Sequence, residues 1–103
     1  MESLAYLQKV VRDLLGQPTV ARQLSATATS ANTVLTTTCR RITIRATGGS
    51  VRYVIGTGAQ TATSTSHFIA QDERLDLRVP SNAQIAVIRG GGSDAVLEVS
   101  ELD

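Results

Sequence analysis

The sequence predicts an all-β domain, an antiparallel β-sandwich of jelly-roll or other Greek-key type, preceded by one N-terminal amphipathic helix. Residues 51–55 and 75–79 alternate apolar and polar side chains, as strands with one buried face do. Turn residues recur along the chain at strand-like intervals, which gives about seven or eight short strands. A helical pattern occurs only at the N-terminus.

The helix is expected over residues 3–15, with Ser3 as its N-cap. Gly16 ends it and Pro18 prevents its continuation. Four apolar residues form the centre of its stripe, Leu4, Leu7, Val11 and Leu14. Three surfaces can cover that stripe: the chain's own β domain, equivalent helices of an oligomer, or a groove on another protein. Residues 1–18 are thus expected to form a docking or oligomerisation arm, and residues 19–103 the β-sandwich.

The first half of the β domain is rich in Thr, Ala and Ser. Residues 19–32 carry weak alternation typical of an edge strand or extended arm, and residues 33–38 indicate a short strand. Residues 40–47 and 50–56 alternate more clearly, and Gly48-Gly49 lies between them. Because glycine adopts positive φ without strain, this pattern predicts a hairpin.

The second half begins with a long small-residue loop at residues 56–66, interpreted as a surface connection that crosses between the sheets. It lacks the lysine and the spacing of a phosphate-binding loop. Short strands are expected over residues 67–70, 74–79 and 95–101. The strand at residues 84–89 is apolar on both faces, which predicts a central position, and residues 90–94 are expected to form a hairpin turn.

The composition indicates one globular domain with an aliphatic core. The chain has 103 residues, of which 42% are hydrophobic and 3% aromatic. Cys39 is the only cysteine, so no internal disulfide is possible and a reducing compartment is expected. The sequence shows no signal peptide and no apolar run of membrane-spanning length, so no membrane association is expected.

Charge is distributed unevenly although the formal net charge is only +1. Residues 14–71 contain five arginines and no acidic residue, whereas residues 72–103 contain seven acidic residues and three arginines. The two regions can pair within the fold or between neighbouring copies. With no dense basic run and few aromatic residues, no nucleic-acid partner is expected. Four arginines are the expected β-domain contribution to an interface, Arg40, Arg41, Arg45 and Arg52, beside the helical stripe.

The sequence offers little for catalysis. His67 is the only histidine, and a grouping with Ser64 or Ser66 and Asp72 lacks the elbow motif of serine hydrolases. The acidic residues around position 73 are interleaved with arginines and lack the spacing of a calcium loop. We therefore expect no enzyme activity, no metal and no cofactor.

Residues 36–102 resemble small bacteriophage virion proteins in the order of their features. These are a strand leading into IGTGAQTATSTSHFIA, a polar turn, an LDLRVP strand, and an IAVIR strand before a glycine turn and a final acidic strand. The resemblance implies a β-sandwich that decorates or cements a capsid, or an adaptor or fibre base in the particle.

The same resemblance implies a symmetric homo-oligomer, with a trimer favoured, in contact with other virion structural proteins such as the major capsid protein. The protein would be made in the bacterial host cytoplasm and end in the virion. Two other hypotheses remain open. One is a carbohydrate-binding module at a fibre or tail tip that uses residues 56–66 and 90–94, and the other is a small hydrolase acting through His67.

Overall fold

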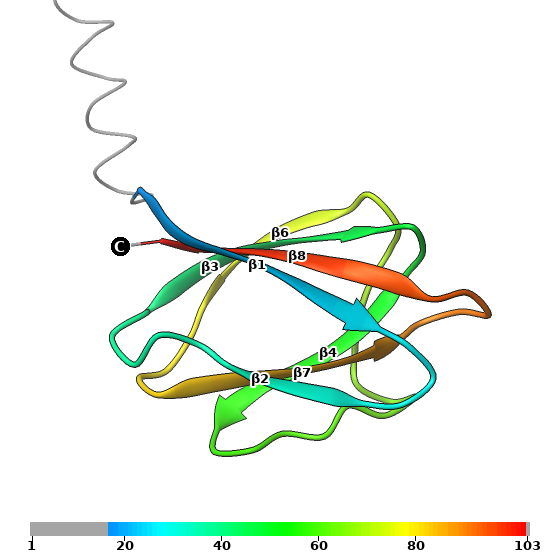
Figure 1. The fold of residues 1–103 in the computed structure, drawn as a ribbon, viewed down its shortest axis with the longest axis horizontal. Helices are drawn as coiled ribbons and strands as arrows, with labels where there is room; N and C mark the ends of the chain where they lie inside the picture. Colours follow the sequence, from blue (N-terminus) through cyan, green and yellow to red (C-terminus); the bar gives the residue numbers. More distant parts are fainter. Residues whose placement is uncertain (1–16, 103) are drawn as a thin grey trace, which may run out of the picture.

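The computed structural model describes residues 17–102, which form two four-stranded antiparallel β-sheets packed face to face (Figure 1). The predicted N-terminal helix, with Leu4, Leu7, Val11 and Leu14, lies outside the described residues. The strands are β1 (Pro18–Ala26), β2 (Ala31–Val34), β3 (Arg41–Thr47), β4 (Val51–Thr57), β5 (His67–Ile69), β6 (Arg74–Arg78), β7 (Ala83–Arg89) and β8 (Ala95–Leu102).

The strand order identifies a jelly roll. Sheet A has the order β1-β8-β3-β6 and sheet B the order β2-β7-β4-β5. Strands pair across the middle of the chain: β1 with β8, β2 with β7, β3 with β6, and β4 with β5. This is the arrangement of a long hairpin rolled into two sheets, so the expected jelly-roll sandwich of short strands is confirmed.

Alternation places the core as predicted. Ile42 and Ile44 of β3 are fully buried, while Arg41 and Arg45 lie on the outer face of sheet A. On β7, which lies between β2 and β4, Ile85 and Val87 face the core. The predicted central position of this most apolar strand is therefore confirmed.

Both expected glycine hairpins are wrong. β3 belongs to sheet A and β4 to sheet B, so the turn at Gly48-Gly49 carries the chain from one sheet to the other. Gly48 does adopt a positive φ of 77°. Residues 90–94 likewise connect β7 of sheet B to β8 of sheet A. Alternation shows that each strand has one face in the core, but two strands that contribute to one core can lie in opposite sheets.

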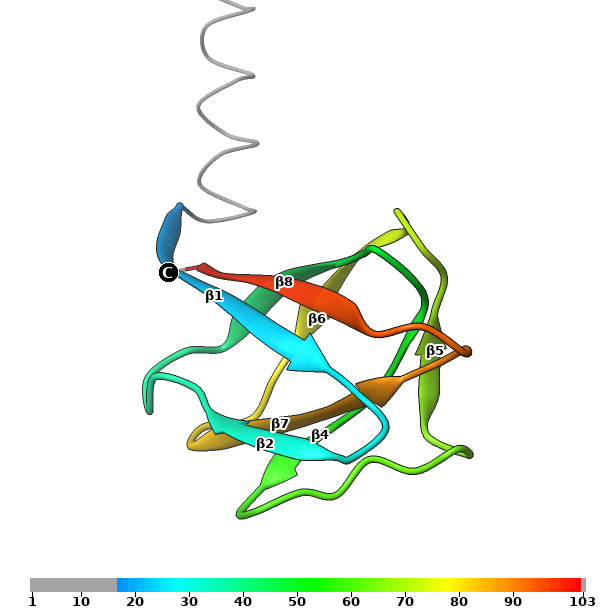
Figure 2. The same cartoon turned by 45° about the vertical axis from the view of Figure 1, so that its right-hand side comes forward.

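The loop at residues 58–66 does not cross between the sheets, contrary to the expectation for residues 56–66, because β4 and β5 are paired neighbours in sheet B. It lies instead across the outer face of that sheet, below β7 and β2 (Figure 2). The amide of Gln60 donates to Asn32 Oδ1 at 3.0 Å, and the amide of Ala62 donates to Ser30 Oγ at 2.8 Å. These bonds attach the loop beside β2, at the far edge of the sheet from β5.

The two ends of the described chain lie side by side, where β1 begins beside the end of β8 (Figures 1 and 2). Pro18 is paired with Leu102, and β1 forms one edge of sheet A, as its weak alternation predicted. The opposite edge of sheet A is formed by β6.

Candidate functional site

A pocket of about 240 Å³ lies between the two sheets, lined by Tyr53, Ile55, His67, Leu77 and Arg78. Tyr53 and Ile55 come from β4, His67 from β5, and Leu77 and Arg78 from β6. The pocket therefore opens where the β6 edge of sheet A faces the β4–β5 side of sheet B. We call these residues, together with Leu75, the open seam.

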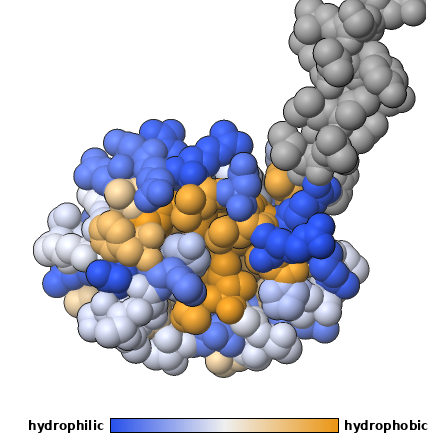
Figure 3. Space-filling model, turned by 180° about the vertical axis from the view of Figure 1, so that it is seen from behind, coloured by the Kyte–Doolittle hydropathy of each residue, from blue (hydrophilic) through white to orange (hydrophobic). Residues whose placement is uncertain are grey.

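The open seam is apolar at its centre. Ile55, Leu75 and Leu77 pack against the core but stay partly exposed. The back of the molecule shows a band of apolar residues bordered by hydrophilic side chains (Figure 3). An apolar area with a polar rim is typical of a surface that binds another protein or an apolar ligand.

Tyr53 and His67 form the aromatic wall of the pocket. Their ring centroids are 5.5 Å apart, and the ring planes are inclined by 36°. Burial raises the pKa of Tyr53, and the negative charge of Glu73 raises it further, so the phenol stays protonated at neutral pH. This wall can hold an apolar group and supply a hydrogen-bond donor.

The grouping of His67 with Ser66 and Asp72 gains no support. Ser66 Oγ accepts a hydrogen bond from the amide of Thr63 at 2.9 Å. Asp72 pairs with Arg45 at 3.3 Å. Both groups are thus engaged with other partners.

A second polar centre is buried at the β1 end of the sandwich, around Glu101. Its side chain is 1% exposed, and Oε2 accepts from Arg22 Nε at 2.6 Å and from the amide of Thr36 at 3.2 Å. Oε1 has no hydrogen-bond partner among the described residues. Burial raises the pKa of Glu101, but hydrogen bonds from Thr36 and Arg22 outweigh it, so the net pKa is below its ordinary value. The carboxylate joins β1, β8 and the segment after β2.

Cys39 lies near this carboxylate and is buried. Its Sγ donates to the carbonyl of Arg41 at 3.3 Å. Burial raises the pKa of the thiol, and the charge of Glu101 adds to this effect. The thiol is therefore protonated and shielded, which is the opposite of a reactive cysteine.

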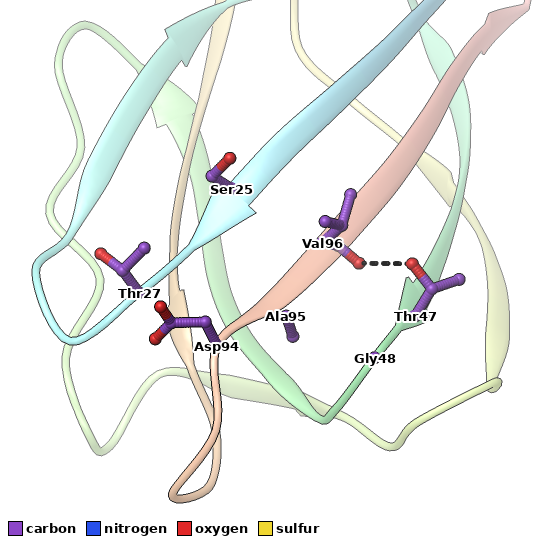
Figure 4. Close-up of a pocket in the computed structure, with 7 residues that line it drawn as sticks. All are labelled: Ser25, Thr27, Thr47, Gly48, Asp94, Ala95 and Val96. Atoms are coloured by element: carbon purple, nitrogen blue, oxygen red, sulfur yellow. Dashed lines mark hydrogen bonds between the residues drawn. The ribbon is translucent and has the colours of Figure 1, made fainter.

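The pocket in Figure 4, of about 310 Å³, lies at one end of sheet A and has mostly hydroxyl-bearing or small lining residues. Thr47 Oγ1 donates to the carbonyl of Val96 at 3.4 Å, and Thr27 Oγ1 to the carbonyl of Thr29 at 3.3 Å. Asp94 pairs with Arg89 at 3.1 Å. Its polar groups are largely used within the chain, so it offers no set of groups for catalysis.

The four arginines predicted for an interface occupy different surfaces. Arg41 and Arg45 share the outer face of sheet A, opposite Arg78 and Arg74 of β6. Arg40 lies before β3, and its Nη1 donates to the carbonyls of Thr37 and Cys39.

Arg52 is on sheet B. Its guanidinium lies 4.9 Å from the ring centroid of Phe68, and Nη1 donates to the carbonyl of Ser66 at 2.9 Å. The structure therefore groups two of the four predicted arginines, adds Arg74 and Arg78 to them, and places Arg52 elsewhere.

Some arginines of the basic region, residues 14–71, form ion pairs within the fold with acidic residues of the acidic region, residues 72–103. Arg22 contacts Glu101, and Arg45 contacts Asp72. Each pair joins an arginine from residues 14–71 to an acidic residue from residues 72–103.

The two loops of the carbohydrate-binding hypothesis leave sheet B at opposite ends. Thr57, at the end of β4, is paired with Ala83 at the start of β7, whereas residues 90–94 follow the end of β7. A site that uses both loops would have to extend along the whole sheet.

Within residues 17–102, no group of three or more His, Cys, Asp or Glu side chains is placed to hold a metal ion. The same residues include no helix of the length and apolar character needed to cross a bilayer.

The comparisons with known proteins define the fold class. No family model matches the chain, and no curated protein sequence matches it. Among solved structures, the chain is similar to PirA, with a TM-score of 0.51, 21% identity, and coverage of 82% of this chain and 95% of PirA.

Two further structures have the same architecture. The plu4264 protein of Photorhabdus luminescens has a TM-score of 0.53 at 11% identity, covering 86% of this chain and 66% of that one. A de novo designed double-stranded β-helix has a TM-score of 0.52 at 13% identity, covering 81% and 99%. The protein is thus an all-β protein with the double-stranded β-helix fold.

Sequence reasoning missed the buried Glu101 pair, although a signal was present. Arg22 shares its parity with Leu24 and Ala26, and Glu101 shares its parity with Leu97 and Val99. One basic and one acidic residue at inward positions of two strands indicate a buried pair.

Proposed function

We propose that this protein is a non-enzymatic structural component of a phage particle, which decorates or cements the capsid or anchors a fibre through oligomeric contacts. In this role the protein is part of the virion and contacts other structural proteins, such as the major capsid protein. In this proposal the helix expected over residues 3–15 docks the protein on the assembly, and the β domain forms contacts between copies.

The observation that carries the proposal is the open seam. A domain with a complete core normally covers its aliphatic side chains, yet Ile55, Leu75 and Leu77 of the open seam remain partly exposed. Subunit contacts in an assembly are built from such apolar areas with polar rims.

The outer face of sheet A supports the same role. Arg41, Arg45, Arg74 and Arg78 lie on neighbouring strands there, and Thr43 Oγ1 donates to Asp76 Oδ1 at 2.7 Å between them. Arginine forms forked bonds to carboxylates and packs well at interfaces. Such a face suits an acidic surface of a neighbouring subunit.

Deletion of residues 1–16 tests the docking role, because β1 begins only at Pro18. We expect the shortened protein to keep its β circular-dichroism spectrum but to lose incorporation into particles. A double variant, Leu7→Gln with Val11→Gln, should reproduce the loss, whereas Gln8→Ala should incorporate normally. Full incorporation of the shortened protein would overturn the docking role.

A further inference from the structure

We propose that β6 is a self-association edge, at which two copies pair their β6 strands antiparallel about Leu75. This inference deepens the proposed function and rests on its assembly role. It names the occupant of the open seam as a second copy of this chain. The contact would join the two four-stranded sheets A into one continuous sheet.

The hydrogen-bond pattern of β6 shows which backbone groups are available. The amide of Val79 donates to the carbonyl of Arg40 at 2.8 Å, and the amide of Ala46 donates to the carbonyl of Glu73 at 3.4 Å. In an antiparallel ladder, alternate residues direct both backbone groups to the same neighbour. The odd-numbered residues of β6 therefore face β3. The residues whose backbone groups face the free edge are Arg74, Asp76 and Arg78.

The charges on these three residues select the register. Pairing Asp76 with Asp76 of the second copy would also place Arg74 opposite Arg78, so every facing pair would have like charges. A register centred on Leu75 places Arg74 opposite Asp76 twice. Opposite charges thus face each other in both of these edge-facing pairs.

A register centred on Leu77 is less favourable. It also pairs Asp76 with an arginine, Arg78, but it sets Arg74 opposite Pro80, which has no amide hydrogen to donate. The register centred on Leu75 keeps Pro80 out of the ladder, which favours it.

The apolar side chains that β6 contributes to the open seam fit the same contact. Leu75 and Leu77 have their side chains on the inner face of sheet A, where they remain partly exposed at the open seam. With Leu75 on the twofold axis, the Leu75 side chains of the two copies would meet and cover the exposed apolar part of β6. The contact is isologous and closes as a dimer.

Cysteine cross-linking tests the register with a matched pair of variants. Both are made with Cys39→Ala, so that no other thiol is present. Leu75→Cys would face its own copy at a Cα separation of about 4.5 Å, within disulfide range. Leu77→Cys, on the same strand and equally placed against the core, would face Glu73 instead. We expect a rapid disulfide dimer only for Leu75→Cys, on a non-reducing gel after mild oxidation.

Charge exchange tests the pairing by native mass spectrometry of the purified protein. Arg74→Asp alone and Asp76→Arg alone should each weaken the dimer at least about tenfold, because like charges then face each other twice. The double variant with both changes should restore it. A monomer, a trimer indifferent to these changes, or preferential cross-linking at position 77 would overturn the inference. Incorporation into particles is measured in a separate experiment. Failure of the proposed function can therefore be distinguished from failure of the dimer contact.

Discussion

The two edge strands of sheet A, β1 and β6, differ in how fully the rest of the chain covers their inward side chains. β1 contacts β2 and β7 of the other sheet as well as its neighbour β8, and its inward Arg22 is matched by the buried Glu101. β6 is paired with β3, and its Leu75 and Leu77 pack against the core but stay partly exposed.

The difference shows where the fold is complete and where it is not. At the β1 edge, even a buried charge has its partner within the chain. At the β6 edge, the charges point outward and the aliphatic side chains lack full cover. An edge strand of alternating charge resists most pairings, but it accepts a partner that sets opposite charges face to face.

The largest expected effect comes from disrupting the buried Arg22–Glu101 pair at the β1 edge. Glu101→Gln removes the charge that faces Arg22 and leaves a partly buried guanidinium without its counter-ion. We expect a loss of about 3 kcal/mol in the free energy of unfolding, measured by urea denaturation.

Glu98→Gln is the matched control, because Glu98 lies on the same strand but on the outer face of sheet A. It should change the free energy of unfolding by no more than about 0.5 kcal/mol. Equal losses for the two variants would show that the buried pair is no stronger than a surface carboxylate.

A second pair of variants compares the edges directly. Leu24→Ala on β1 removes a buried side chain and should cost about 3 kcal/mol, whereas Leu75→Ala on β6 should cost about 1 kcal/mol in dilute protein. Thermal unfolding at low protein concentration measures both values. If the two losses were equal, the open seam would be as well packed as the core, and the distinction between the edges would fail.

Much of the fold could be predicted from period-two patterns. Ile42 and Ile44 were correctly placed inward, and the central position of residues 84–89 followed from their apolar character on both faces. The sheet assignment of neighbouring strands could not be predicted. A turn such as Gly48-Gly49 allows either a hairpin or a crossing, and the choice depends on contacts between residues distant in sequence.

The candidate site was harder to predict for the same reason. The open seam brings Tyr53 and Ile55 beside Leu77, residues more than twenty positions apart, and only the topology places them together. Arg74 and Arg78 alternate with acidic residues in the sequence, but in the sheet they lie opposite Arg45 and Arg41. Loop 58–66 covers the outer face of sheet B through its bonds to Ser30 and Asn32, which no local pattern indicates.

The smallest expected effect is the loss of folding stability when acid protonates Glu101 at the β1 edge. Protonation removes only the charge-dependent part of the Glu101 contacts. The pKa of Glu101 in the folded protein lies below its ordinary value, so folding favours the ionised form. This contribution is fully present above the ordinary glutamic-acid pKa of about 4.3 and is lost as the pH falls through the lower, folded-state value. Wild type should therefore lose stability toward acid more steeply than Glu101→Gln, with thermal midpoints measured from pH 7 down to pH 3. Parallel curves for the two proteins would mean that other carboxylates dominate and that the β1 edge is closed by packing alone.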